Sequence, residues 1–216
     1  MRTRVTRVLL VVGALTAILA LLEGGLDVWL GLYCAVWAAF GVYGMVSIDD
    51  DLARERFRPP EPGADRMPLR AIRLAALAHL IVGALDAGRW HLTSVPSGLR
   101  AIALVGMIVG GFLIIQSMRA NRFFSSVIRV QTERGHRVID SGPYRRVRHP
   151  GYLGMLIAVS CSGLALGSWL GFALAALYSA LIVRRVWFED AFLKANLTGY
   201  QAYANRVAFR LIPGAW

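Results

Sequence analysis

Apolar residues in this chain occur in long runs, and the short polar stretches between the runs carry nearly all of the charge. A helix needs about 20 mostly apolar residues to cross roughly 30 Å of hydrocarbon. Four runs approach this length, at residues 8–22, 28–48, 69–87 and 101–118. We therefore expect each run to form a membrane-spanning helix, and the pattern predicts an all-α protein.

A fifth stretch, residues 150–183, contains no charged residue over 34 positions. One helix of that length would be about 51 Å long, which is too long for a single crossing even with tilt. Gly163, Gly167, Ser168 and Gly171 offer a turn near the middle. We therefore predict a tight helical hairpin, which completes a polytopic membrane helical bundle of about six spans.

Three details bear on these spans. Three arginines precede the first run, as in a signal peptide, but no small-residue cleavage site follows it, which favours a retained span. Arg70, Arg73 and Asp86 interrupt the third run only near its ends, where charged side chains can reach the membrane interface. In the fourth run, Gly106 and Gly110 are four apart and would let another helix approach closely.

Composition agrees with a membrane protein and changes the interpretation of the charge. Hydrophobic residues make up 56% of the chain and charged residues 17%, whereas soluble domains carry about a quarter charged residues. A net charge of +11 would indicate nucleic-acid binding in a soluble protein. With six spans and both termini inside, 22 of the 24 basic residues lie on one side, as the positive-inside rule requires of the cytoplasm. The charge therefore reports topology, and we expect no nucleic-acid partner.

Two segments on that side are too long for simple turns, since bundle connections usually take two to eight residues. The first, 49–68, begins with Asp49, Asp50 and Asp51 and has a proline-rich second half. An acidic triplet can bind a divalent cation, but it more often stabilises a helix N-terminus. We expect a short interfacial helix here and no metal site.

The second segment, 119–149, is richest in chemistry, with Gln131, His136, Tyr144 and eight arginines. Pro150 suits the first position of the following helix and biases His149 away from helical geometry. His149 is therefore expected at the mouth of a helix at the membrane surface, where polar groups indicate function. The scattered arginines also fit a second interpretation, in which they contact lipid phosphates.

The stretch GPYRRVRHPGYLG at 142–154 resembles the signature of integral-membrane methyltransferases, the isoprenylcysteine carboxyl methyltransferases and the phospholipid methyltransferases. RVWFED at 185–190 and GYQAY at 199–203 resemble the closing pattern of the same family. The resemblance covers residues 121–216, and the motifs occur together in a membrane chain, which makes it specific.

This resemblance implies a binding site for S-adenosylmethionine. The residues that match the family's cofactor-binding positions are Gln131, His136, Arg137, Val138, Ile139, Tyr144, His149, Pro150, Gly151, Tyr152 and Glu189. Arg185 matches the position that faces the methyl acceptor, so Arg185 and Glu189 are the expected catalytic residues. Two departures are visible: the family's second glutamate is Asp190 here, and Gln131 stands closer to His136 than in the eukaryotic enzymes.

The reaction that the resemblance implies is methyl transfer to a lipophilic acceptor, a lipid or isoprenoid carboxylate, thiol or amine. We expect it at the cytoplasmic face of a bacterial inner membrane, with membrane lipids as partners. Two alternatives stay open. One is an NADPH-dependent enzyme like the sterol reductases, which have Gly-Trp-Trp where Gly142, Pro143 and Tyr144 stand. The other is a non-catalytic lipid-binding protein on the same scaffold.

These expectations divide the chain into two regions. Residues 1–118 would form the N-terminal transmembrane helices with the cytoplasmic loop 49–68. Residues 119–216 would form the methyltransferase region, with the cofactor loop, the hairpin 150–183 and C-terminal helices. Aromatic and basic residues after position 199, including Tyr200, Tyr203 and Arg210, suit a helix that lies in the membrane interface.

Overall fold

The computed structural model describes residues 2–59 and 66–216. All regular secondary structure in these residues is helical, and the helices are joined by turns and irregular segments. The α-helices are α1 (Arg2–Glu23), α2 (Val28–Ser47), α3 (Asp50–Phe57), α4 (Arg66–Leu85), α5 (Ser97–Ala120), α6 (Pro150–Leu166), α7 (Trp169–Asn196) and α8 (Tyr200–Arg206). Short π or 3₁₀ turns form η1 (Asp86–Trp90), η2 (Thr132–Arg134) and η3 (Gly142–Arg145). Within the described ranges, five helices (α1, α2, α4, α5 and α7) are long and apolar enough to cross a membrane, and α6 is a shorter apolar helix of 17 residues. The predicted all-α polytopic bundle is confirmed.

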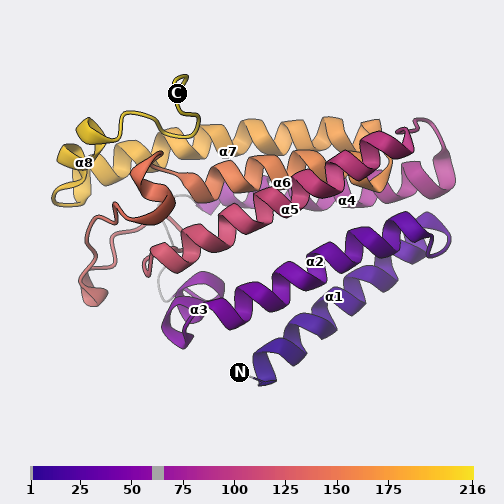
Figure 1. Ribbon diagram of the computed structural model, residues 1–216, viewed down its shortest axis with the longest axis horizontal. Coiled ribbons are helices and arrows are strands. Elements are labelled where there is room, and N and C mark those ends of the chain that lie inside the picture. The colour runs from indigo at the N-terminus through magenta and orange to yellow at the C-terminus, as the bar shows by residue number, and fades with distance from the viewer. Residues whose placement is uncertain (1, 60–65) are drawn as a thin grey trace.

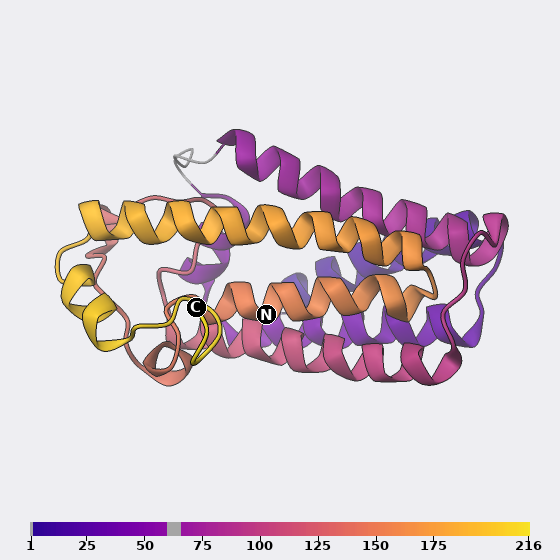
Figure 2. The ribbon, with the colours of Figure 1, turned by 90° about the horizontal axis from the view of Figure 1, so that it is seen from above.

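The long helices lie side by side, and their connections are sorted between the two ends of the bundle (Figures 1 and 2). The α1–α2 turn, the α6–α7 turn and the segment between η1 and α5 lie at one end. α3, residues 121–149 and α8 lie at the other, which we call the loop end. α1 begins near α3, since Arg4 Nη1 donates to the carbonyl of Ile48 at 3.3 Å. This alternation agrees with the predicted topology, in which the two long polar segments and both termini lie on the same side of the membrane.

The charge-free stretch forms the two helices that its length predicts. α6 ends at Leu166, and Gly167 follows in the left-handed conformation with φ of 98°, which glycine adopts readily. The Ser168 hydroxyl then caps α7 by accepting from the Gly171 N–H at 2.9 Å. α7 is longer than predicted, because it continues unbroken through the charged residues to Asn196. Its 28 residues span about 42 Å, so its last turns extend beyond a hydrocarbon core of about 30 Å.

Asp86 does not reach the membrane interface as its place at the end of the third run predicts. Its side chain is fully buried, and it accepts from the backbone N–H groups of Leu92 and Thr93 at 3.0 and 3.1 Å. The hydroxyls of Ser168, at 2.5 Å, and of Thr93 also donate to it. An aspartate is too short to extend to an interface as arginine does. Here it ties the α4–α5 connection to the start of α7.

α5 and α6 cross at backbone contact distance. A Cβ atom on Gly110 would lie 2.6 Å from the backbone nitrogen of Ala158 and 2.6 Å from the carbonyl oxygen of Gly154. Gly106 likewise faces Cys161 of α6 without room for a side chain. The prediction that this glycine pair allows close helix approach is confirmed. The contact keeps the start of α6, where His149 is the N-cap residue, close to α5.

We expect the substitution Gly110→Ala to destabilise the protein by about 1–3 kcal/mol, because the added methyl group forces two packed backbones apart. The thermal unfolding midpoint of the purified protein in detergent measures this. Gly31→Ala is the matched control, since a Cβ there meets nothing within 4 Å. It should leave the midpoint unchanged or raise it, and an equal loss in both variants would contradict the crossing described here.

Candidate active site

A cavity of about 310 Å³ lies at the loop end, where α4, α6, α7 and α8 meet residues 121–149. Five residues of α7 line it at spacings of three or four: Tyr178, Ile182, Arg185, Glu189 and Leu193. Residues at these spacings lie on one face of a helix. This face of α7 therefore forms a wall of the cavity, with two charged side chains between apolar ones.

The cavity gathers most of the residues that the sequence motifs single out. Those that line it are His136, Arg137, Val138, Ile139, Tyr144, His149, Gly151, Tyr152, Arg185 and Glu189. Gln131 and Pro150 are not among the lining residues. Gln131 is buried, and its Nε2 donates to the carbonyl of Phe123 at 2.8 Å. Pro150 occupies the first position of α6, as predicted. The roles of these residues toward a cofactor stay predictions.

The Glu189 carboxylate faces two side chains of the cavity. Its Oε2 accepts from the Tyr152 hydroxyl at 2.6 Å, and its Oε1 lies 3.9 Å from His149 Nδ1. The other ring nitrogen of His149, Nε2, lies 3.4 Å from Asp190 Oδ1. His149 therefore lies between two adjacent acids, and the Glu189 side chain keeps 24% of its surface exposed.

Asp190 is not a cavity residue but the centre of a buried ionic cluster. Its Oδ1 accepts from Arg148 Nε at 2.7 Å and from the Tyr200 hydroxyl at 3.1 Å. Its Oδ2 accepts from Arg210 Nε at 3.1 Å and lies 3.2 Å from Lys194 Nζ. One carboxylate that is 1% exposed thus joins α7 to α8, to the residues before α6 and to the C-terminal tail. Asp190 stands where the family has a second glutamate, and its contacts are structural.

The C-terminal tail runs along the residues that precede α6. The Arg148 guanidinium donates to the carbonyls of Val207 and Ala208 at 2.7 and 2.8 Å, and its backbone N–H donates to Phe209 at 2.9 Å. The next N–H, of His149, donates to the carbonyl of Arg210 at 2.9 Å. These bonds fix the backbone of His149 at the mouth of α6.

Tyrosines form an uncharged polar wall of the cavity. Tyr200 and Tyr203 of α8 are 4% and 2% exposed, so both side chains face the protein interior. The prediction that they face a membrane interface is wrong. The Tyr203 hydroxyl donates to the carbonyl of Tyr144 at 2.8 Å, and Asn121 Nδ2 donates to the Tyr144 hydroxyl at 3.3 Å. Burial raises the pKa of all three phenols above the usual value. They are therefore neutral at physiological pH.

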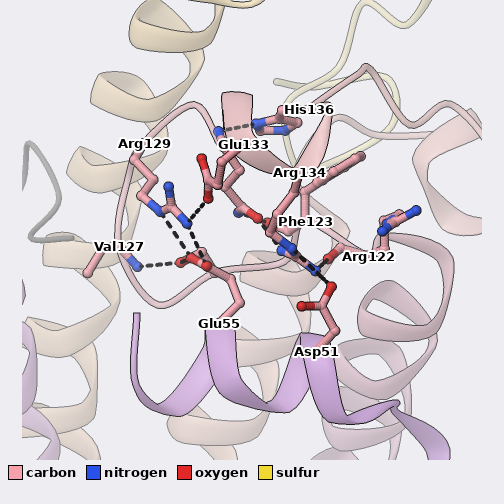
Figure 3. A network of polar contacts seen from close by, with 11 residues as sticks. Asp51, Glu55, Arg122, Phe123, Val127, Arg129, Glu133, Arg134 and His136 are labelled. Carbon is pink, nitrogen blue, oxygen red and sulfur yellow. Dashed lines mark hydrogen bonds and ion pairs between the residues drawn. The ribbon is translucent and has the colours of Figure 1, made fainter. Parts of the chain in front are cut away.

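Two ion pairs hold residues 121–149 against α3 (Figure 3). Glu55, which is 3% exposed, accepts from Arg129 Nε at 3.2 Å and Nη2 at 2.7 Å, and from the Ser125 hydroxyl at 2.6 Å. Asp51 Oδ2 accepts from Arg134 Nη2 at 2.6 Å and Nε at 3.1 Å. The hydrogen bonds to Arg134 lower the pKa of Asp51. α3 thus acts as the support on which this segment is folded.

The start of α3 confirms the capping interpretation of the aspartate triplet. Asp49 is the N-cap residue, and its Oδ1 accepts from the Leu52 N–H at 2.7 Å. Asp51 forms an ion pair with Arg134. The predicted helix in the first half of 49–68 is confirmed as α3, whereas residues 60–65 of the proline-rich half lie outside the described part of the chain.

His136 closes the segment on itself. Its Nδ1 accepts from the Gln131 N–H at 3.2 Å, and its ring packs 4.5 Å from the centre of the Phe123 ring. Burial, together with the nearby Arg129 and Arg134, lowers the pKa of His136 to about 4. The imidazole is therefore neutral at pH 7, as its acceptor role requires.

Arg56 is a cavity residue that no motif indicated. From α3, its Nη1 donates to the carbonyl of Ser125 at 3.1 Å. From α7, Arg185 Nη2 donates to the next carbonyl, of Ser126, at 2.8 Å. Two guanidinium groups from distant parts of the sequence therefore reach the cavity beside neighbouring peptide groups. Burial lowers the pKa of Arg56, but arginine stays protonated in proteins.

Comparison with known proteins agrees with this arrangement. Residues 99–198 match the model of the family described as phospholipid methyltransferase. Over 109 residues the chain is 32% identical to proteins from Oryza sativa subsp. indica and Oryza sativa subsp. japonica, each named "Probable protein-S-isoprenylcysteine O-methyltransferase". The matched part is 49% of this chain and 57% of each rice protein, so the chain spans little more than half the length of these relatives.

The part of the chain from residue 99 to 198 is therefore similar to membrane methyltransferases. The resemblance that the motifs predict is confirmed for the C-terminal half of the chain, which contains every motif residue of the cavity. α1–α4, including the cavity residue Arg56, lie outside the stretch that matches the family model.

We expect Asp190→Asn to destabilise the protein by about 3–5 kcal/mol, because it leaves the buried Arg148 guanidinium without its charged partner. The thermal unfolding midpoint measures the loss. Asp140→Asn is the control, since Asp140 pairs with Arg206 where both side chains are more than half exposed. It should cost about 0–1 kcal/mol. Similar losses in the two variants would contradict the central role of Asp190.

We also expect acid to open the segment around His136. In an open segment the His136 imidazole takes up a proton near its usual pKa of 6.5. In the closed segment it does so only near pH 4. The stability of the closed segment relative to the open one is therefore greatest above pH 6.5, and it decreases as the pH falls toward 4. Hydrogen–deuterium exchange of residues 131–136, corrected for intrinsic rates, measures this loss of protection. In His136→Gln the pH dependence should disappear, and its persistence would assign the effect to another group.

Proposed function

We propose that the protein transfers a methyl group from S-adenosylmethionine to a lipophilic acceptor at the membrane surface. The observation that carries this proposal is the single face of α7 on which Arg185 and Glu189 enter one cavity with the motif residues of 136–152. The family match over 99–198 supplies the reaction class. S-adenosylmethionine supplies, when bound, a methyl group activated by a sulfonium centre.

The cavity residues fit such a donor. Its ammonium group needs an anion, and Glu189 is a cavity carboxylate held in place by the Tyr152 hydroxyl. Neutral Tyr144, Tyr200 and Tyr203 offer flat polar surfaces for an adenosine moiety. A volume of about 310 Å³ lies within the range of about 300–1,000 Å³ that is usual for small-ligand sites.

The acceptor would lie on the side of the cavity between α4 and α7, where apolar residues predominate and the arginines are Arg56, Arg73 and Arg185. Ile72 and Ala76 of α4 face Tyr178 and Ile182 of α7 there. Such walls suit an alkyl or isoprenoid chain, which gains free energy on leaving water. Arg185 would hold an acidic group of the acceptor by a charge-assisted hydrogen bond. Because α4 and α7 are both membrane-spanning helices by length and composition, an acceptor dissolved in lipid would enter from their side.

The protein's part in this chemistry is mainly positioning. A carboxylate or thiolate attacks the methyl carbon with its own electron pair and needs no general base, whereas an ammonium acceptor must first lose a proton. Arg185 and Glu189 are one helical turn apart, so they would hold acceptor and donor at a fixed separation. The buried tyrosines and apolar residues exclude water from the reacting atoms.

We expect Glu189→Gln to weaken S-adenosylmethionine binding about 10- to 100-fold, the usual cost of losing a hydrogen bond to a charged group. Glutamine keeps an acceptor for Tyr152, so the fold should persist. Isothermal titration calorimetry of the purified protein in detergent measures the Kd. Arg185→Gln should leave this Kd unchanged and lower labelled-methyl transfer into a total lipid extract.

The matched control is Asp27→Asn, because Asp27 caps α2 at the opposite end of the bundle and asparagine caps equally well. It should bind and transfer like the unsubstituted protein. Competition by NADPH would favour the reductase alternative. Binding of S-adenosylmethionine without transfer to any extract would favour the non-catalytic alternative, and no binding at all would refute the proposal. Mass spectrometry of a labelled product identifies the acceptor as an oxygen, sulfur or nitrogen.

A further inference from the structure

A second cavity lies on the other side of α3. It has a volume of about 900 Å³, is lined by residues of α1, α2, α3 and α5, and shares no lining residue with the candidate active site. Its walls are apolar and include Val11, Phe40, Ile115 and Met118. α1, α2 and α5 are membrane-spanning helices by length and composition, so the cavity faces a region where lipid chains are the available apolar ligands.

The charged residues that line this cavity belong to the first turns of α1, to α3 and to the residue that follows α3. They are Arg4, Arg7, Asp50, Arg54 and Arg58, which is four cations and one anion. Arg4 and Asp50 form an ion pair. Arg7, Arg54 and Arg58 also line the cavity, and Asp50 is the carboxylate among its lining residues in the described part of the chain. The cavity therefore has positively charged residues at one end and apolar residues along the rest of its walls. This arrangement complements the head group and the acyl chains of an anionic lipid.

α3 presents different residues to its two sides. Arg54 lies in the last turn of α3 and Arg58 is the residue that follows the helix, and both line the second cavity. Arg56 lies about 200° around the helix from Arg54, and it lines the first cavity instead. Phe57, whose side chain is 62% exposed, lines the second cavity beside the arginines. An anion with an apolar body would pair with these arginines and cover this ring.

We propose that the second cavity binds one anionic phospholipid. Its phosphate group would lie among Arg7, Arg54 and Arg58, where arginine forms charge-assisted hydrogen bonds to phosphate. An acyl chain would lie along the apolar residues of α1, α2 and α5. The site differs from general attraction of a basic surface to a membrane, because it requires the cavity as well as the charge. It does not depend on the proposed methyl transfer.

Native mass spectrometry of the detergent-solubilised protein tests this, with phosphatidylglycerol and phosphatidylcholine of identical acyl chains as probes. We expect one phosphatidylglycerol to be retained at concentrations where phosphatidylcholine is not. The double variant Arg54→Gln/Arg58→Gln should lower its retention about 10- to 30-fold, as the loss of two basic residues near a lipid phosphate implies. Arg145→Gln/Arg146→Gln removes the same charge from two exposed residues outside the cavity and should bind normally.

A third variant, Gly44→Leu, fills the cavity and keeps every charge. A Cβ on Gly44 meets only Ile115 and Met118, both at 3.9 Å, so the backbone has room for a side chain. Retention of phosphatidylglycerol should fall in this variant too, with the circular dichroism spectrum unchanged. Equal retention of both lipids, or normal retention in Gly44→Leu, would overturn the proposal. Should Gly44→Leu fail to fold, glycerol 3-phosphate decides: displacement of the lipid by this chain-free head group would equally overturn it.

Discussion

The loop end of this protein depends on one buried carboxylate, that of Asp190. A charge removed from water needs partners on every side, and Asp190 takes Arg148, Arg210, Lys194 and Tyr200 from four parts of the chain. Satisfying this group brings the end of α7, the start of α6, α8 and the C-terminal tail to one point. The cavity forms beside that point, and Glu189 enters it because successive residues of a helix point about 100° apart. Two adjacent acids thus have separate tasks, one structural and one facing the cavity.

Much of this architecture can be predicted from the sequence, because the signals are local. Charge-free runs mark the helices, the excess length of 150–183 requires a hairpin, and Asp49 and Pro150 mark helix starts. The family motifs also lead to most cavity residues. What escapes prediction is set by contacts between distant positions. Glu55 and Arg129 are 74 residues apart, and no periodicity indicates their pairing. The burial of Asp86 and of the α8 tyrosines escapes prediction for the same reason. Only the packed structure offers buried partners for their polar atoms.

α3 shows how much a short helix can contribute when its ends are well capped and its sides differ. Its eight residues carry two acids that hold the 121–149 segment, one arginine at the candidate active site and one at the second cavity, which Arg58, the residue after the helix, also lines. None of these residues lies in the stretch that matches the family model. The candidate active site is therefore built partly from residues that lie outside this stretch.

The length of α7 has a further consequence. Because the helix begins at the Ser168 turn and continues without a break, Arg185 and Glu189 stand at fixed heights of about 25 and 31 Å along its axis from the far end of the bundle. In the proposed function, the helix would set the depth at which acceptor and donor are held. A lipid is constrained in the same coordinate, since its polar group stays near the membrane surface while its chain stays in the hydrocarbon. Selection by depth would discriminate among lipophilic molecules before any specific contact is made, according to how far each one's reactive atom stands from its apolar tail.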